Sequence, residues 1–586
     1  MSSATASTGV SWSDLLKAPF FSKLDRSFAD FIAPAESEDS FVRAAAAWLS
    51  YQLRRGQIFL DLTVAPLPDE DSAELPPWPE LEIWMEELRK SRAVGAPGDS
   101  TPLILTDSGK IYLQRYWCYE NLLATKLLGF SKKEIGAQME VSEEKLDALF
   151  QGADEQKEAA RKALARSFSV ISGGPGTGKT TTVLKILLLL FENNVDVRVR
   201  LVAPTGKAAA RLQESIRDGL AKLGCDDHLR EKIEQLEAST IHRLLGAVSD
   251  SVYFRHNAEN PLVADLIVLD EASMVDLPLM AKLFEALPSD CRLIMLGDKD
   301  QLASVEAGSV FTGIVEAATG ENPPLRNLAT LLQKNFRFGN DSGIYQVCNS
   351  VRQGEGAEAL EILRSGATDT IWRDLPAVEE LKEALRPNVL ERFRGIFEAR
   401  DPAAALDAFG EFQILTALRW GPFGKEGINF LVEEILREEA WAPVGKRHYS
   451  GRPLMVTEND YSLRLFNGDI GILFEDEEGK LMSYFRSEDG SIRKISPLRL
   501  PFAEPAYAMT VHKSQGSEFD RVLTILPGRE TRILTRELIY TAVSRARSEA
   551  EVWATEEIFK AAVAQKVSRG SALVEMLNLK LAKERK

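Results

Sequence analysis

Short apolar runs that alternate with helix-like patterns dominate the chain from about residue 155 onward. Four of these runs are Phe168–Ile171, Val199–Val202, Leu266–Leu269 and Leu293–Leu296. Runs of this length are typical of strands that are buried on both faces of a parallel sheet. Because strands alternating with helices indicate an α/β architecture, the pattern predicts an α/β domain here. Similar runs at Phe412–Leu415 and Val522–Ile525 predict a second sheet of the same kind.

A different pattern separates those last two runs, over residues 446–503. Four short β-like segments lie there, at Leu454–Thr457, Gly471–Phe474, Leu481–Phe485 and Ile492–Ile495. Glycine and acidic residues separate them, as expected for tight turns. The segment therefore predicts a small antiparallel β insertion in the second α/β domain.

Residues 1–150 are predicted to be mostly helical. Two short apolar segments, Leu103–Leu105 and Lys110–Leu113, flank Asp107-Ser108-Gly109 and predict a hairpin. The acidic, proline-rich stretch Pro66–Pro79 predicts an exposed loop. A second helical stretch is expected from Tyr116 through Leu149.

Composition narrows the class of protein. The chain has 586 residues, enough for several domains, and its 45% hydrophobic and 27% charged content is that of a folded protein. Its four cysteines form no CxxC pair, which argues against a disulfide scaffold or a cysteine-bound metal cluster. The N-terminus lacks the features of a secretion signal, and no apolar run reaches the ~18 residues of a membrane span. We therefore expect a soluble, cytoplasmic protein.

The charge is acidic and unevenly distributed. There are 71 basic and 87 acidic residues, a net charge of −16. Residues 1–150 hold 15 basic and 23 acidic residues, a net of −8, and the other 436 hold 56 and 64, also −8. The net charge argues against a protein that coats nucleic acid with its whole surface, as a histone does. It does not exclude a local basic groove, because the effect of each charge is screened within ~8–10 Å. The acidic N-terminal region is better suited to a protein partner than to phosphate.

A glycine-rich segment matches the phosphate-binding loop G-x-x-x-x-G-K-[ST]. Its residues are Gly173, Gly174, Pro175, Gly176, Thr177, Gly178, Lys179 and Thr180, and Thr181 follows. A predicted strand precedes the loop and an apolar helix follows it, so backbone N–H groups and the helix N-terminus would surround phosphate oxygens. Lys179 would neutralise the phosphates and the Thr180 hydroxyl would bind Mg²⁺. The alternative, a glycine turn that binds nothing, does not explain this context.

Two carboxylates, Asp270 and Glu271, end the apolar run Leu266–Leu269. Asp270 is placed to hold Mg²⁺, and Glu271 to orient and deprotonate a water molecule. An acidic helix cap is the alternative interpretation. Together with the phosphate loop, the pair predicts a nucleotide hydrolase and leaves open kinases, GTPases, ATPases and motors.

Eight stretches in order narrow the class further, because together they resemble the motifs of superfamily 1 helicases. They are the segment around Gln156, the phosphate loop, 201–209 (LVAPTGKAA), 239–244 (STIHRL), 270–273 (DEAS), 297–302 (GDKDQL) with 335–337 (NFR), 510–516 (TVHKSQG) and 540–546 (YTAVSRA). The amino-acid sequences of these stretches are similar to those of the RecD family, the α subunits of exodeoxyribonuclease V. The sequence near Ile111–Trp117 also resembles that of the family. The resemblance covers most of the chain.

The resemblance implies a fold and an ATP site. The fold would be α/β, with two RecA-like motor domains at 151–330 and at 331–445 with 504–586, a helical partner-docking domain at 1–150 and a small β-barrel at 446–503. Gln156 would read adenine, Glu518 would contact the nucleotide, and Gln301 would sense the γ-phosphate. Arg337 and Arg545, from the second lobe, would stabilise charge on that phosphate. The implied cofactors are ATP and Mg²⁺.

The resemblance also implies a path for single-stranded DNA across both lobes. The candidate contacts are Thr205, Lys207, Thr240, His242, Thr510, His512 and Lys513. For each threonine or histidine, local capping or core hydrogen bonding is an equal alternative. A hairpin near 247–264, containing Tyr253–Pro261, would split the duplex, or else be a plain connecting loop. Asn459 and Asp460 of the insertion are equally suited to turns.

The function implied by the resemblance is ATP-dependent 5′→3′ DNA unwinding at double-strand break ends during recombinational repair. RecB-like and RecC-like subunits would be the partners, and the nuclease would lie on another chain. Spacing alone does not give the direction of travel. Two alternatives stay open: a stand-alone RecD-like helicase, which the short region before the motor disfavours, and a non-motor assembly subunit with a relic nucleotide site.

Overall fold

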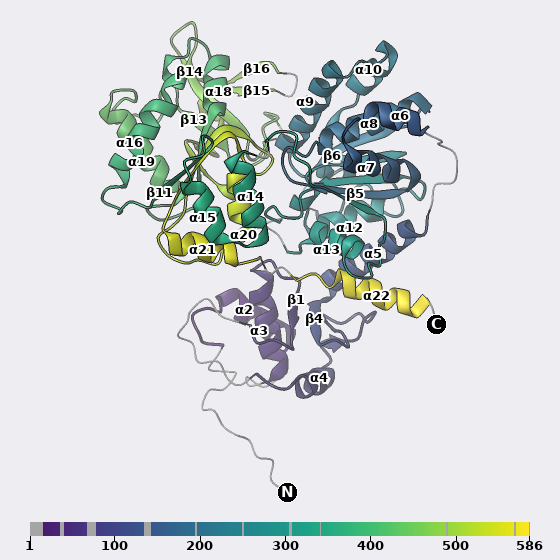
Figure 1. Cartoon of the computed structure of the whole chain (residues 1–586). Helices are drawn as coiled ribbons and strands as arrows, with labels where there is room; N and C mark the ends of the chain where they lie inside the picture. The colour runs from purple at the N-terminus through teal and green to yellow at the C-terminus, as the bar shows by residue number, and fades with distance from the viewer. Residues whose placement is uncertain are drawn as a thin grey trace.

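Two parallel sheets lie side by side in the upper part of the molecule, and a smaller N-terminal domain lies beneath them (Figure 1). The computed structural model describes residues 16–34, 40–66, 78–133, 142–193, 196–248, 251–303, 307–339, 341–460, 462–487, 490–567 and 570–584. The loop predicted over Pro66–Pro79 falls largely outside these ranges. No helix within them is both long and apolar enough to cross a membrane.

The first α/β lobe is built on a six-stranded parallel sheet. In spatial order its strands are β10 (Ala329–Leu332), β5 (Phe168–Gly173), β9 (Arg292–Gly297), β8 (Leu266–Leu269), β6 (Val199–Ala203) and β7 (Ala238–Thr240). The four early apolar runs are thus confirmed as strands, and every residue of β5 and β8 is buried. Since β10 ends at Leu332, the boundary predicted at residue 330 falls inside a strand of this sheet.

Helices connect these strands and cover the sheet. They are α7 (Asp154–Ala165), α8 (Lys179–Asn193), α9 (Gly206–Lys222), α10 (Asp227–Glu234), α11 (Ile241–Leu245), α12 (Leu277–Ala286) and α13 (Val310–Thr319). The apolar helix expected after the phosphate loop is α8, and most of its residues from Thr182 to Phe191 are buried. Strands and helices alternate along the chain, which confirms the predicted α/β class.

The second α/β lobe is built on a five-stranded parallel sheet. Its spatial order is β11 (Thr370–Asp374), β20 (Ala546–Ala554), β19 (Phe519–Ile525), β12 (Phe412–Thr416) and β18 (Ala508–Thr510). Its helices are α14 (Gly343–Gln353), α15 (Gly356–Arg364), α16 (Leu381–Arg392), α17 (Arg394–Glu398), α18 (Pro402–Glu411), α19 (Lys425–Glu438), α20 (Arg536–Val543) and α21 (Glu556–Ala564). The second predicted sheet is therefore also confirmed.

The insertion in this lobe is a five-stranded antiparallel sheet. The strands, in spatial order, are β16 (Ile492–Ile495), β15 (Leu481–Arg486), β14 (Ile470–Glu475), β13 (Pro453–Val456) and β17 (Ala503–Pro505). The antiparallel β prediction is confirmed. The order is that of an open sheet, so closure into a barrel stays a prediction.

The N-terminal domain combines helices with a small sheet. Its helices are α2 (Lys23–Ile32), α3 (Phe41–Leu53) and α4 (Leu81–Arg89), and its strands are, in order, β1 (Phe59–Asp61), β4 (Lys110–Leu113), β3 (Leu103–Leu105) and β2 (Val94–Gly95). The hairpin of β3 and β4 was expected, and the other two strands were not. Buried aromatic rings of Trp48, Tyr51 and Trp84 form the centre of its core.

Two further helices connect this domain to the first lobe. The long helix α5 (Gln114–Ser131) packs on α12, and its residues Leu123 and Leu127 share one core with Phe168 of β5. A short helix, α6 (Glu143–Leu149), follows. Helix α5 therefore packs as part of the first lobe, although it was predicted to belong to a domain spanning 1–150.

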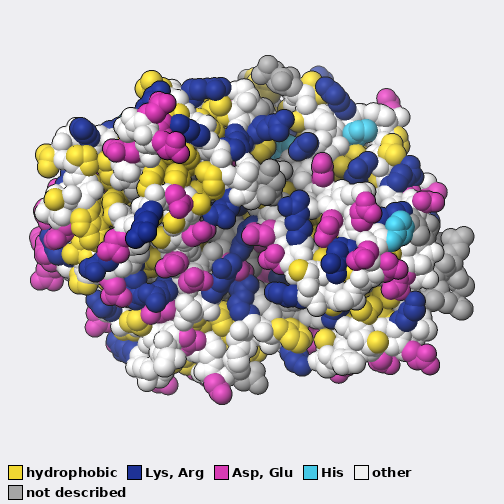
Figure 2. Space-filling view, turned by 90° about the horizontal axis from the view of Figure 1, so that it is seen from above, with side chains coloured by type: hydrophobic (Ala, Val, Ile, Leu, Met, Phe, Trp, Pro, Cys, Tyr) yellow, Lys and Arg dark blue, Asp and Glu magenta, His cyan; other side chains and the backbone are white. Residues whose placement is uncertain are grey.

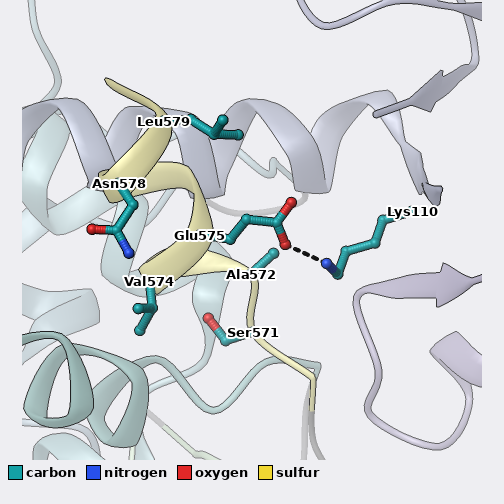
Figure 3. Close-up of a pocket in the computed structure, with 7 residues that line it drawn as sticks. All are labelled: Lys110, Ser571, Ala572, Val574, Glu575, Asn578 and Leu579. Atoms are coloured by element: carbon teal, nitrogen blue, oxygen red, sulfur yellow. Dashed lines mark hydrogen bonds and ion pairs between the residues drawn. The ribbon is translucent and has the colours of Figure 1, made fainter. Parts of the chain in front are cut away.

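The C-terminal helix α22 (Leu573–Glu584) lies against α5 and α13, below the first lobe (Figure 1). Glu575 of this helix points toward Lys110 of β4 and forms an ion pair with it (Figure 3). Next to this pair, the buried Glu120 of α5 accepts hydrogen bonds from the Tyr112 hydroxyl at 3.1 Å and the Ser571 hydroxyl at 2.9 Å. These contacts fasten the C-terminal segment to both the N-terminal domain and the first lobe.

Candidate functional site

The phosphate loop runs from the end of β5 to the start of α8, as its sequence predicts. Gly176 and Gly178 adopt φ values of 80° and 78°, which only glycine takes without strain. The Lys179 ammonium donates to the Gly173 carbonyl at 2.6 Å and the Gly174 carbonyl at 3.1 Å. The cation is therefore held over the loop, where a phosphate chain would contact it. Thr180 and Thr181 occupy the first turn of the helix.

Gln156 of α7 lies behind the loop and is almost fully buried. Its side-chain amide donates to the Thr177 carbonyl at 3.0 Å. A Cβ placed on Gly178 would lie 2.3 Å from Gln156 Nε2 and 3.9 Å from the ring of Phe336. The half-exposed Phe336 ring thus faces the same space, and an aromatic platform there was not assigned from the sequence.

Asp270 and Glu271, the two carboxylates predicted to act in hydrolysis, lie at the carboxyl end of β8. Burial and the adjacent Glu271 raise the pKa of Asp270, and the Lys179 ammonium opposes that rise. The Glu271 backbone N–H donates to Asp270 Oδ1 at 2.8 Å, and Glu271 has a left-handed backbone with φ 50°. A left-handed non-glycine residue stores strain, and such residues cluster at functional sites. Asp270, Glu271 and Lys179 are thus brought to one place.

Asp298, at the end of β9, connects the predicted γ-phosphate sensor to the second lobe. The side chain of Gln301 donates to its carboxylate at 3.1 Å, and the Tyr540 hydroxyl of α20 donates to the same oxygen at 3.0 Å. Burial raises the pKa of Asp298, while Lys179 lowers it. Both partners stood in quoted motifs, but roles for Asp298 and Tyr540 were missed because their contact spans 242 residues.

More hydrogen bonds cross the cleft beside Gln301. The Leu302 backbone N–H donates to the Thr541 hydroxyl at 2.9 Å, and the Gln515 amide donates to the Leu302 carbonyl at 2.7 Å. Leu302 directly follows Gln301, the predicted sensor, whereas Thr541 and Gln515 belong to the second lobe. A displacement of the loop that carries Gln301 and Leu302 would therefore also move the residues of the second lobe that are bonded to Leu302.

The two predicted arginines differ in their surroundings. Arg545 is buried in the second lobe and donates to the carbonyls of Thr541 at 3.2 Å and Ser517 at 3.1 Å. Arg337 lies in the segment between β10 and α14, so it comes from the connection between the lobes and not from within the second sheet. Its Nη2 atom donates to Glu518 Oε1 at 2.6 Å.

Glu518, predicted to contact the nucleotide, is surrounded by arginines. Besides Arg337, its carboxylate lies 3.3 Å from Arg211 and 3.4 Å from Arg547. Burial would raise the pKa of Glu518, but the charges of Arg211 and Arg337 lower it to about 2. The carboxylate is thus an anion inside a cationic cluster next to the phosphate loop. Arg211 lies two residues after the motif at 201–209, and its contact with residues about 300 positions away left no local signal.

The candidate DNA contacts of the first lobe lie at two helix starts. Thr205 caps α9 by accepting from the Ala208 N–H at 3.2 Å, and Thr240 caps α11 by accepting from Arg243 at 3.2 Å. Both threonines therefore have the local capping role that was the alternative to DNA binding. Burial lowers the pKa of Lys207, in the first turn of α9, to about 8. The ring of His242 lies 5.8 Å from that of Phe254.

The candidates of the second lobe lie where β18 leads into the short helix η3 (Val511–Ser514). Thr510 ends the strand, and His512 and Lys513 belong to the helix. The Lys513 ammonium donates to Asn467 of the insertion at 2.6 Å. Seen from above, Lys and Arg side chains gather along the hollow between the two halves of the molecule (Figure 2). A local basic groove thus exists despite the net charge of −16.

The predicted hairpin near 247–264 is partly described. An antiparallel bridge pairs Ala247 with Phe254, and Val252 and Tyr253 beside it are exposed. The turn residues Asn459 and Asp460 of the insertion accept local backbone hydrogen bonds, from Asn467 at 2.9 Å and from Leu463 at 3.0 Å. Asn459 and Asp460 therefore have the turn role that the sequence offered for them.

Three family models match the chain. Residues 17–112 match the N-terminal domain of the RecBCD enzyme subunit RecD, residues 156–307 match an AAA domain, and residues 505–552 match a UvrD-like helicase C-terminal domain. These segments correspond to the N-terminal domain, the first lobe and the end of the second lobe.

Individual relatives extend over nearly the whole chain. The RecBCD enzyme subunit RecD of Mycolicibacterium smegmatis is 38% identical, over 93% of this chain and 95% of that protein. The ATP-dependent RecD2 DNA helicase of Deinococcus radiodurans is 30% identical, over 72% of this chain and 52% of that protein. A solved Bacteroides Pif1 bound to single-stranded DNA is 16% identical, with a TM-score of 0.38, over 74% of this chain and 97% of that one.

Proposed function

The chain belongs to the RecD family of RecBCD enzyme subunits, and from this premise we propose that it is the ATP-dependent 5′→3′ DNA helicase subunit of a RecBCD-type exodeoxyribonuclease V. One observation carries the motor part of the proposal. The phosphate loop and the loop that carries Gln301 face the second lobe, where the Tyr540 hydroxyl donates to Asp298 and the Thr541 hydroxyl accepts from the Leu302 N–H. Such a divided site is what an ATP-driven change between two lobes requires.

ATP is the proposed substrate, and each group has a proposed role in its hydrolysis. Lys179 and the N–H groups of the loop bind the phosphates, while Gln156 and Phe336 hold the base. Glu271 orients the attacking water and accepts its proton. Arg337 and Arg545 stabilise charge on the γ-phosphate, an effect worth ~10³–10⁵ in turnover in related chemistry.

The residues present fit a Mg²⁺ ion held with the phosphates of ATP. Asp270 is a half-buried carboxylate beside the loop, and Thr180 offers a hydroxyl at the start of α8. Across the described ranges, no cluster of three or more His, Cys, Asp or Glu side chains forms a metal site. One carboxylate and one hydroxyl suit Mg²⁺, which usually keeps waters and phosphate oxygens as its other ligands. Bound there, the ion would neutralise charge between the phosphates.

DNA would lie in the basic hollow between the lobes. Lys207 and Lys513 supply cations from opposite sides, which gives a grip on phosphates that does not depend on sequence. Closure around ATP and release after hydrolysis would move these two contacts relative to each other. The 5′→3′ direction is proposed from the family resemblance alone.

RecB-like and RecC-like subunits are the proposed partners, and the cytoplasm is the proposed compartment. The N-terminal domain offers an exposed apolar surface, because Leu24 and Phe31 of α2 are 63% and 79% exposed. These positions are seven apart and so share one helix face. A partner would bury them, which agrees with a docking role for this domain.

A stand-alone helicase, like the RecD2 relative, is the second candidate function. Purification from native cells followed by mass identification of bound proteins distinguishes the two. Stoichiometric recovery of RecB-like and RecC-like chains supports the subunit, and a single active chain supports the alternative. The third alternative, a relic nucleotide site, is disfavoured because Lys179, Glu271, Gln301 and Arg545 are all present.

A further inference from the structure

Arg211 of the first lobe reaches across the cleft into the second lobe. It lies on α9, and its Nη1 atom donates to the Gly516 carbonyl at 2.7 Å. Its Nη2 atom lies 3.3 Å from Glu518 Oε2. One guanidinium therefore holds a backbone carbonyl and a carboxylate two residues apart, a fork geometry that arginine provides and lysine does not.

The same guanidinium also acts on the hydrolysis carboxylates. Its positive charge helps to lower the pKa of Asp270, and the charge of Glu271 acts in turn on Arg211. Burial lowers the pKa of Arg211 itself, and the Glu518 charge opposes this. Arg211 thus lies between the carboxylates of the first lobe and the arginine cluster around Glu518.

The start of the same helix carries a proposed DNA contact. Lys207 lies four residues before Arg211, so both side chains share one face of α9. Gly206 packs so closely on Phe466 of the insertion that a Cβ there would lie 2.9 Å from the ring. Asp469 of the insertion acts on the charge of Lys207. One rigid helical turn therefore separates the DNA groove from the cross-cleft bonds of Arg211.

We propose that Arg211 is a positioning residue that couples DNA engagement to ATP hydrolysis. DNA that binds at Lys207 fixes the start of α9, and Arg211 transmits that position to Gly516 and Glu518. Glu518 in turn holds Arg337, so the arginine reaches the γ-phosphate only when α9 is in place. Coupling of this kind is reciprocal, so ATP binding also changes the affinity for DNA. The inference rests on the proposed helicase function.

The test compares Arg211→Ala and Arg211→Lys with the wild type in the full chain. Arg217→Ala is the matched control, because Arg217 is an exposed arginine on the same helix. Two ratios are measured for each protein. The stimulation ratio is the kcat for ATP hydrolysis in the presence of saturating oligo(dT) divided by the kcat in its absence. The Kd ratio is the Kd for labelled oligo(dT) in the presence of a non-hydrolysable ATP analogue divided by the Kd in its absence.

We expect Arg211→Ala to lower the stimulation ratio at least tenfold and to bring the Kd ratio close to one. Arg211→Lys, whose ammonium reaches one acceptor at a time, should give intermediate ratios, and it decides the question if the alanine variant does not fold. Arg217→Ala should keep both ratios. Wild-type ratios in the Arg211 variants, or an equal loss of rate with and without DNA, would overturn the coupling role. Absence of stimulation in the wild type would instead refute the proposed function.

Discussion

The Nη2 atom of Arg337 lies 2.6 Å from Oε1 of Glu518, so a proposed phosphate-binding arginine is paired with a carboxylate. Arg211 and Arg547 approach the same carboxylate. Without Glu518, these cations would face one another in a partly buried space. A nucleotide phosphate is a second anion that can take over this neutralisation.

Glu518→Gln should destabilise the nucleotide-free protein more than the nucleotide-bound one. We expect the melting temperature without nucleotide to fall by roughly 5 °C, because removing one partner leaves charges uncompensated. The rise on adding a non-hydrolysable ATP analogue should exceed that of the wild type. Thermal melts with and without the analogue measure this, and an equal or smaller rise in the variant would contradict it.

Lys179→Gln should abolish DNA-stimulated ATP hydrolysis, because the loop then lacks the cation that faces the phosphates. The fold should persist, since Lys179 bonds only to nearby loop carbonyls in the described contacts. Lys222→Gln, at the exposed end of α9, is the control with the same change of charge. Steady-state turnover and circular dichroism are the measurements, and turnover close to wild type in Lys179→Gln would refute the site.

Glu120 should make the stability of the packing of α22 against α5 depend on pH. Burial raises the pKa of Glu120 to about 7, above its ordinary value of 4.5, while hydrogen bonds from Ser571 and Tyr112 limit the rise. The folded state then favours the protonated carboxyl. The protonated Glu120 carboxyl therefore contributes to the stability of the folded state in full below about pH 4.5, and this contribution is lost as pH rises through about 7. Between pH 5.5 and 8 this loss is roughly 2 kcal/mol.

Hydrogen exchange of the α22 amides, compared with Glu120→Gln at each pH, measures that change. The comparison removes the intrinsic pH dependence of exchange. We expect the wild-type amides to lose protection relative to the variant by about 25-fold between pH 5.5 and 8, the factor that corresponds to that energy. Parallel curves for the two proteins would show that Glu120 does not titrate in this range.

The motifs of the ATP site could be predicted from sequence because each is local. A strand, a glycine loop and a helix in succession specify the phosphate loop, and an apolar strand ending in two carboxylates specifies Asp270 and Glu271. The contacts that unite the site were not predictable. Tyr540 meets Asp298, and Arg211 meets Gly516, across hundreds of residues and between separate sheets.

The N-terminal domain was predicted less well for a different reason. Its strands β1 and β2 have three and two residues, too few to show a period of two. Helix α5 follows β4 directly, and only its packing against α12 shows that it belongs with the motor. The acidity of residues 1–150 pointed to a protein partner, and the exposed apolar face of α2 gives that prediction a definite surface.

Leu24→Asp combined with Phe31→Asp should prevent partner binding without stopping ATP hydrolysis. Both side chains are exposed on α2, so the monomer tolerates the change, whereas a buried interface would not. Phe430→Asp, at a phenylalanine that is 59% exposed on α19, is the control. Affinity purification with quantified partners is the measurement. Full recovery of partners by the double variant would place docking elsewhere.

As proposed above, this chain is a 5′→3′ helicase driven by ATP bound between its two lobes. The most direct measurement is strand separation of duplexes that carry either a 5′ or a 3′ single-stranded tail, using the purified chain and Lys179→Gln. We predict that the wild type unwinds the 5′-tailed duplex in an ATP-dependent manner, and that Lys179→Gln unwinds neither. Preference for the 3′ tail, or equal unwinding by Lys179→Gln, would contradict the account.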